Sequence, residues 1–191
     1  PEALPAGAAR RRVLGIADNE TECFVGKGQL DARPVSRVGE ALESVPGVVL
    51  TQHSGSGKAN QFFLRGFNLD HGTDFMTTVD GMPVNMPSHG HGQGYADLNF
   101  MIPELIDTIR YRKGPYYADE GDFSAAGAAH IDYRDAFERN IAEVTAGHYD
   151  FQRGLLAGST EAAHGTLLGA AEVQFSDGPW DLPEESKKYT G

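Results

Sequence analysis

The sequence predicts an α+β fold over residues 35–135, followed by longer antiparallel β-strands. Three observations lead to this prediction. A short helical pattern ends at a Pro-Gly pair, short strands rich in aromatic and β-branched residues follow between glycines, and longer alternating segments begin near residue 140. Helices and strands repeat with different periods, so this change of pattern near residue 138 marks a change in organisation. We therefore expect a small mixed domain and then a sheet of a different kind.

The first element is a two-turn helix over residues 38–45. Its apolar residues recur at i, i+3, i+4 and i+7, which places them on one face: Val38, Ala41, Leu42 and Val45. Proline disfavours helical backbone at the residue before it, and glycine permits a left-handed exit. Pro46 and Gly47 should therefore end the helix and turn the chain into a strand at residues 48–51.

Two further strands are expected at residues 62–65 and 75–79. Both are rich in aromatic or β-branched side chains and are bounded by glycines. Asp80-Gly81 is a typical turn pair between extended segments. These features predict a small α+β domain with short elements.

Composition excludes several classes of protein. The formal net charge of −11 over 191 residues disfavours a nucleic-acid binder that neutralises phosphates. Cys23 is the single cysteine, so the chain forms no intramolecular disulfide. The sequence has no run of about 18 apolar residues, so we expect no transmembrane helix. Residues 1–12 lack the apolar stretch of a secretory signal, and we expect any such signal to lie upstream.

The segment 166–176 has the alternation of a membrane strand. One face carries Leu167, Gly169, Ala171, Val173 and Phe175, and the other carries Thr166, Leu168, Ala170, Glu172, Gln174 and Ser176. An apolar outer face and a mostly polar inner face over about ten residues suit a transmembrane β-barrel. Strands at 140–146 and 151–159 should precede it, with a turn at 160–165. An amphipathic sheet of a soluble domain is the alternative.

Three strands cannot close a barrel. Open sheet edges are not tolerated in lipid, because unpaired backbone groups there cost several kcal/mol each. We therefore expect the first antiparallel strands of an incomplete transmembrane β-barrel over residues 139–191, with the sequence stopping in a loop at Gly191. The complete protein should be longer.

Four segments in fixed order carry a family resemblance. They are Leu42 to Val48, Phe63 to Gly66, Val79 to Pro83 and Ile106 to Pro115. Together they resemble the plug domain of TonB-dependent outer-membrane receptors. The resemblance implies a plug domain with a mixed β-sheet and short helices at residues 35–135, after a periplasmic N-terminal extension at 1–34. Its structural motif residues are Pro46, Gly47, Gly66, Asp80, Gly81, Gly114, Pro115, Gly121 and Gly127.

The resemblance also implies a function without covalent chemistry. Such receptors bind a scarce ligand, such as a metal chelate or siderophore, at the extracellular face and import it with energy supplied by TonB. The expected partners are TonB, the ligand and the outer-membrane lipid, with no nucleic acid and no required cofactor. Residues 13–17 are a candidate TonB box, although a short apolar patch is more often ordinary packing.

Cationic residues at the motif positions are candidates for plug-barrel ion pairing. Arg65 stands at the Arg-Gly position, and Lys113, preceded by Arg112, stands where the family usually has arginine. Lysine weakens the bidentate geometry that arginine offers to a carboxylate. The segment after Pro115 also lacks the usual Tyr-Gly and Gly-Gly pairs, so we expect a divergent subgroup whose ligand cannot be inferred from the best-known members.

Histidines in three glycine-containing loops are candidate ligand-binding residues. The resemblance places these loops at one end of the plug. The first loop contains His53, the second contains His71, and the third contains His89, His91 and Gln93. Imidazoles suit zinc, copper, nickel or iron, so His71, His89 and His91 are candidate metal ligands. The alternative is hydrogen bonding within the loops. Carboxylates that could coordinate calcium are more often solvated, and they are Asp70, Asp74, Asp119, Glu120 and Asp122.

Two other functions stay open. A non-transporting outer-membrane signalling receptor or adhesin would share the plug. A soluble metallohydrolase could use the same histidines with Asp70 or Asp97, but zinc enzymes usually hold their ligands on rigid elements, and no accompanying general base stands out.

Overall fold

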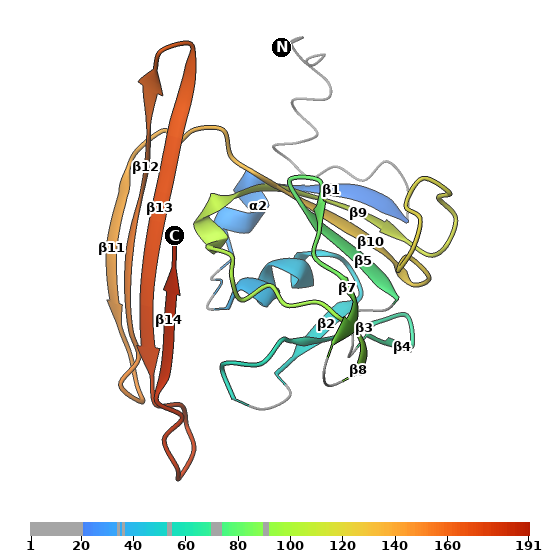
Figure 1. Cartoon of the computed structure of the whole chain (residues 1–191), viewed down its shortest axis with the longest axis horizontal. Coiled ribbons are helices and arrows are strands. Elements are labelled where there is room, and N and C mark those ends of the chain that lie inside the picture. The colour runs from blue at the N-terminus through green and yellow to red at the C-terminus, as the bar shows by residue number, and fades with distance from the viewer. Residues whose placement is uncertain (1–20, 34, 36, 53–54, 70–73, 90–91) are drawn as a thin grey trace.

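The computed structural model describes residues 21–33, 35, 37–52, 55–69, 74–89 and 92–191. Figure 1 shows a mixed N-terminal domain beside a tall, curved antiparallel sheet. We call residues 21–133 the N-terminal domain and strands β11–β14 the strand wall. No helix in the described part of the chain is long and apolar enough to cross a membrane.

The central sheet of the N-terminal domain is mixed, as expected. Its strand order is β1 (Glu22–Gly26), β9 (Ile106–Lys113), β10 (Gly127–Tyr133), β5 (Phe75–Val79) and β6 (Met82–Pro83). Strands β10 and β5 are parallel and the other neighbours are antiparallel. Ile109 and Ile131 are among the most buried side chains of the core that this sheet forms.

Strand β1 and helix α2 (Lys27–Asp31) lie within residues 1–34, which the sequence had assigned to an N-terminal extension. All five residues of β1 pair with β9, and Cys23 and Val25 are buried in the core. The folded domain therefore begins upstream of the expected boundary at residue 35. A five-residue strand without strong alternation carries too little local signal to reveal its partner, which lies some eighty residues further along.

The predicted helix forms, but as a 3₁₀ helix, η1 (Val38–Ser44). The Val45 N–H donates to the Leu42 carbonyl three residues earlier, at 3.0 Å, instead of closing an α-helical turn. The expected face is buried all the same, with Val38, Ala41, Leu42 and Val45 at most 4% exposed. Gly47 takes the left-handed conformation at φ +88°, which confirms the exit after Pro46.

Short strands complete the N-terminal domain. β2 (Val48–Thr51), β3 (Gln61–Leu64) and β4 (Phe67–Asn68) form an antiparallel sheet, and β7 (Met86–His89) pairs with β8 (Gly92–Tyr95). Both predicted strands appear within one residue of their expected bounds. Asp80 and Gly81 join β5 to β6 with positive φ at both positions, as a two-residue hairpin turn requires.

The strand wall contains β11 (Ile141–Ala146), β12 (Gln152–Ala162), β13 (Gly165–Ser176) and β14 (Ser186–Thr190), paired antiparallel in chain order. One expectation needs correction here. The turn at 160–165 shrinks to Ala163 and His164, because pairing continues to Ala162 and Gly165. Residues 186–190 form a further strand on β13 that was not predicted, and Gly191 follows it outside the strand.

The two faces of the wall differ as the alternation predicted. Val144, Leu156 and Leu167 point away from the N-terminal domain and are 89%, 65% and 64% exposed. On the other face Leu155 and Ala157 are buried in a second core with Ile102 and Phe137. The wall therefore packs its inner face on the N-terminal domain and presents apolar side chains outward.

Candidate functional site at the interface between the domain and the wall

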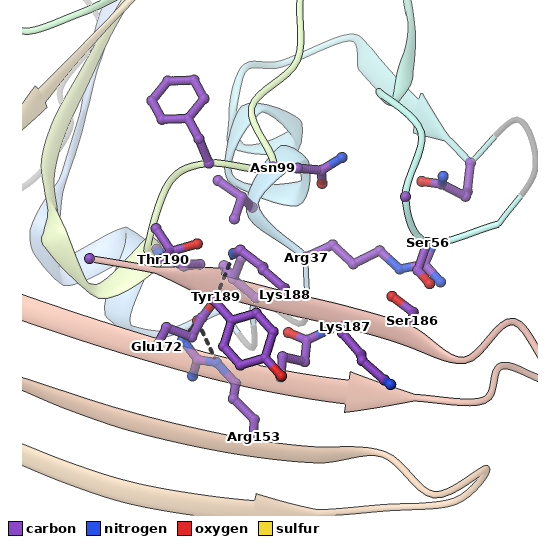
Figure 2. A pocket seen from close by; sticks show the side chains of 18 residues that line it. Arg37, Ser56, Asn99, Arg153, Glu172, Ser186, Lys187, Lys188, Tyr189 and Thr190 are labelled. Carbon is purple, nitrogen blue, oxygen red and sulfur yellow. Dashed lines mark hydrogen bonds and ion pairs between the residues drawn. The ribbon is translucent and has the colours of Figure 1, made fainter.

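An ion network joins the wall to the N-terminal domain. Arg153, on the inner face of β12, donates two hydrogen bonds to Glu104 of the short helix η2 (Pro103–Leu105), at 2.7 and 2.8 Å. The Arg153 Nε also donates to Glu172 of β13 at 2.7 Å. Figure 2 shows Arg153, Glu172 and Lys188 converging from three adjacent strands.

Lys188 of β14 completes this network. Its Nζ lies 2.6 Å from Glu172 Oε1 and donates to the Met101 carbonyl at 2.9 Å. Both cations of the wall therefore hold the segment 101–104 of the N-terminal domain. The two parallel hydrogen bonds from Arg153 to Glu104 add geometric specificity as well as energy.

Two cations, Arg153 and Lys188, face three carboxylates in the network. Glu172 is only 2% exposed, whereas the side chain of Glu143, 3.7 Å from Arg153, is 48% exposed. Burial alone would raise the pKa of Glu104, but the Arg153 hydrogen bonds outweigh it and lower that pKa below its ordinary value. These pairs matter because a buried charge without a partner is strongly destabilising.

A second contact joins two loops. Glu184, between β13 and β14, accepts hydrogen bonds from the Ser56 backbone N–H at 2.9 Å and from its Oγ at 2.6 Å. Trp180 Nε1 also donates to Glu184. The Ser56 hydrogen bonds lower the pKa of the Glu184 carboxyl. This contact holds residues 55–57, beside the predicted ligand-binding loop, against the wall.

A cavity of about 600 Å³ lies between these two contacts. Figure 2 shows Arg37, Ser56 and Asn99 entering it from the N-terminal domain, and Ser186 and Lys188 from β14. Its lining is rich in hydrogen-bonding groups, and it suits a polar interface better than an apolar ligand. The described residues contain no cluster of histidine, cysteine and carboxylate side chains able to hold a metal ion.

The three cations proposed for ion pairing occupy different environments. Arg112 bonds to carboxylates of its own domain, namely Glu22, Asp119 and Glu120. Lys113 is buried, and its Nζ donates to the Pro46 carbonyl at 3.4 Å. Arg65 is a turn residue with φ +50° between β3 and β4. Their pairing with a barrel wall stays a proposal.

The predicted histidine site lies largely outside the described residues. His53, His71 and His91 are outside them, as is Asp70, and the side chain of Gln93 is not described. His89 is exposed on β7, and its ring stacks on Tyr95 with centroids 4.1 Å apart. Two of the candidate calcium ligands, Asp119 and Glu120, accept hydrogen bonds from Arg112.

Sequence reasoning did not single out the network residues Glu104, Arg153, Glu172 and Lys188. A signal was present for Glu172, a charged residue on the inward face of an alternating strand. No local pattern identifies the other members of the network, because Glu104, Arg153 and Lys188 come from three other elements.

Comparison with known proteins identifies the N-terminal domain. A model of the family described as the TonB-dependent Receptor Plug Domain matches residues 21–128, more than half of the chain. The chain belongs to this family. Its N-terminal domain is therefore a plug domain of the kind found in TonB-dependent receptors.

Solved structures share the fold of the plug together with the wall. A variant of the ferric enterobactin receptor PfeA from Pseudomonas aeruginosa, in complex with enterobactin, matches 85% of this chain at 19% identity and a TM-score of 0.63. The pyoverdine receptor FpvA from Pseudomonas aeruginosa PAO1 matches 89% at 17% identity and a TM-score of 0.63. The ferric-catecholate import receptor Fiu from Escherichia coli K12 matches 84% at 17% identity and a TM-score of 0.56. The chain spans only 26%, 23% and 22% of these structures.

Proposed function

We propose that this chain is the N-terminal part of a TonB-dependent receptor that binds a metal chelate at the extracellular face and imports it with energy from TonB. One observation carries the proposal: a plug packs on the inner face of a wall whose outer face is apolar. Strands β12 and β13 have 11 and 12 residues. That length matches the 9–11 residues, roughly, that a tilted strand needs to cross a bilayer.

The connections between the wall strands indicate which end of the wall is extracellular. Figure 1 places the β11–β12 and β13–β14 connections at the same end of the wall, and the Asp177 N–H donates to the Tyr149 carbonyl between them at 2.9 Å. Ser56 of the plug meets Glu184 at this end. We assign this end to the extracellular side, with residues upstream of the plug in the periplasm.

Uptake by the full-length receptor tests the proposal. Cells that carry it as their only receptor for the test chelates should accumulate radioactive iron from ferric enterobactin or a ferric pyoverdine, the chelate types bound by the similar receptors. Deletion of TonB should abolish uptake and leave binding intact, because energy drives import and not recognition. Binding without TonB-dependent uptake would instead identify a signalling receptor or an adhesin. Absence of both would refute the proposal.

The histidines provide a sharper test of the ligand. In the full-length receptor, replacing both His89 and His91 by alanine should weaken binding of the imported ferric chelate at neutral pH by roughly tenfold, the effect of losing one charged or coordinating contact. His148→Ala, in the β11–β12 connection, is the matched control. Unchanged affinity in the double variant would assign these histidines to loop structure alone.

A further inference from the structure

A polar cluster around Arg112 surrounds the start of strand β1. The Arg112 Nε donates to Glu22 at 2.8 Å, and NH1 donates to Asp119 at 2.7 Å and Glu120 at 2.8 Å. Its guanidinium also lies over the Tyr117 ring, 4.5 Å from the centroid. Burial alone would lower the pKa of Arg112, but its hydrogen bonds to Glu22, Asp119 and Glu120 outweigh burial and raise it.

Backbone and hydroxyl contacts fasten the residue just before β1 to the same place. The Lys113 N–H donates to the Thr21 carbonyl at 2.7 Å, and the Thr21 and Tyr117 hydroxyl oxygens lie 3.0 Å apart. The segment 117–120 and the end of β9 thus hold residues 21 and 22 together. Any pull on the upstream chain loads these contacts first.

Strand β1 lies at the edge of the sheet. Among the strands of the described residues its neighbour is β9, with which it pairs over five residues. An edge strand pulled from its end loses its pairs one after another, so the contacts at that end decide when separation begins. The Arg112 cluster occupies that end, opposite Glu22 in the register.

The arrangement of the cluster also allows Glu22 to leave Arg112 and to return to it. When Glu22 leaves, Arg112 keeps Asp119 and Glu120, so no buried cation is left without a partner. Glu120 is fixed in turn by His130 at 2.6 Å, and the other ring nitrogen of His130 lies 2.8 Å from the Thr78 hydroxyl. The site that receives Glu22 is therefore held in place by the plug itself.

We propose that the Arg112 cluster is a latch that holds β1 on the plug at rest and releases it when the upstream chain is pulled. The latch rests on the proposed function, because the pull is the step that TonB would supply. Glu22 is the moving half, and Arg112 with Asp119 and Glu120 is the fixed half.

A reversible cross-link that spares Glu22 and Arg112 tests whether β1 must leave. Phe24 and Arg110 are opposed in the register. The Thr21–Lys113 pair is hydrogen-bonded, and hydrogen-bonded and non-hydrogen-bonded pairs alternate along the ladder. Phe24 and Arg110 therefore form a pair without mutual backbone hydrogen bonds, with Cα atoms about 4.5 Å apart, within disulfide range. In a full-length Cys23→Ala receptor, Phe24→Cys with Arg110→Cys should bind ferric chelate when oxidised but lose at least roughly tenfold in uptake, with recovery after reduction.

A matched cross-link separates release of β1 from wider opening of the plug. Thr51 and Gln61 face each other across β2 and β3, and a disulfide there should leave uptake within about twofold of its reduced form. Full uptake by the oxidised β1 cross-link, or equal loss in both cross-links, would overturn the latch. A parent receptor that imports no chelate would refute the proposed function itself.

Amide hydrogen exchange measures how firmly the latch holds β1, and it does not depend on transport. Glu22→Gln should speed amide exchange over residues 23–26 by roughly tenfold, since a charge-assisted hydrogen bond is lost. Asp31→Asn, which removes an exposed carboxylate on α2, should not change it. Equal exchange in Glu22→Gln and the parent would show that Arg112 does not hold β1, whether or not the receptor transports.

Discussion

Arg153 in the wall and Arg112 in the plug both bind carboxylates from distant segments, but their networks differ in charge balance. Around Arg153, two cations face three carboxylates, and one of these, Glu172, is almost fully buried. Around Arg112, one guanidinium faces three carboxylates, and the side chain of Asp119 is 73% exposed. The first network crosses between the plug and the wall, and the second lies wholly within the plug.

This difference separates a fixed contact from a releasable one. Loss of Arg153 would remove the cation that donates both hydrogen bonds to Glu104 and one of the two cations at the buried Glu172, so the plug and wall should stay together there. Loss of Glu22 from the Arg112 network leaves the cation still paired. Two arginine–carboxylate networks therefore give one fixed contact and one releasable contact, because the networks differ in charge balance and their carboxylates differ in exposure to water.

The largest effect should come from Arg153→Gln in the full-length receptor. Glu104 would lose both hydrogen bonds from Arg153, and the buried Glu172 would keep only Lys188, so we expect the contact between plug and wall to weaken by about 3–5 kcal/mol. Hydrogen exchange over residues 101–105 measures the local free energy of opening. Arg139→Gln, at an exposed position, is the control. A change below about 1 kcal/mol would remove the proposed distinction between the two networks.

Glu104→Gln should have a smaller effect that depends on pH. At pH 7 the loss of two charge-assisted hydrogen bonds should weaken the contact by about 1.5–3 kcal/mol. The pKa of Glu104 is lower in the folded protein than its ordinary value of 4.5, so its ionised form stabilises the contact above that value. This stabilisation is lost as pH falls through the lowered pKa. The difference between variant and parent should therefore disappear in acid, and a difference independent of pH would contradict the ionic explanation.

Asp119→Asn should have the smallest effect. Its side chain is largely exposed, and Arg112 retains Glu22 and Glu120. Exchange over residues 23–26 should stay within about twofold of the parent value, because exposed ion pairs contribute little. A large acceleration would mean that the exposed carboxylate, and not Glu22, controls β1.

Several elements were predictable because their causes are local. Pro46 and Gly47 ended a short helix at the expected place, Asp80-Gly81 formed a hairpin turn, and the alternation over 166–176 separated the two faces of β13. The 3₁₀ geometry of η1 was not predictable, because the same apolar spacing fits both helix types over seven residues.

The sequence by itself determined the family, the division into a plug and a wall, and the side of each strand that faces inward, since motifs, turn residues and periodicity act over a few neighbouring positions. The tertiary structure alone decided which charges meet. Glu22 reaches Arg112 across 90 positions and Glu104 reaches Arg153 across 49. Such pairs depend on how strands distant in sequence pack and pair, and no local pattern specifies that arrangement.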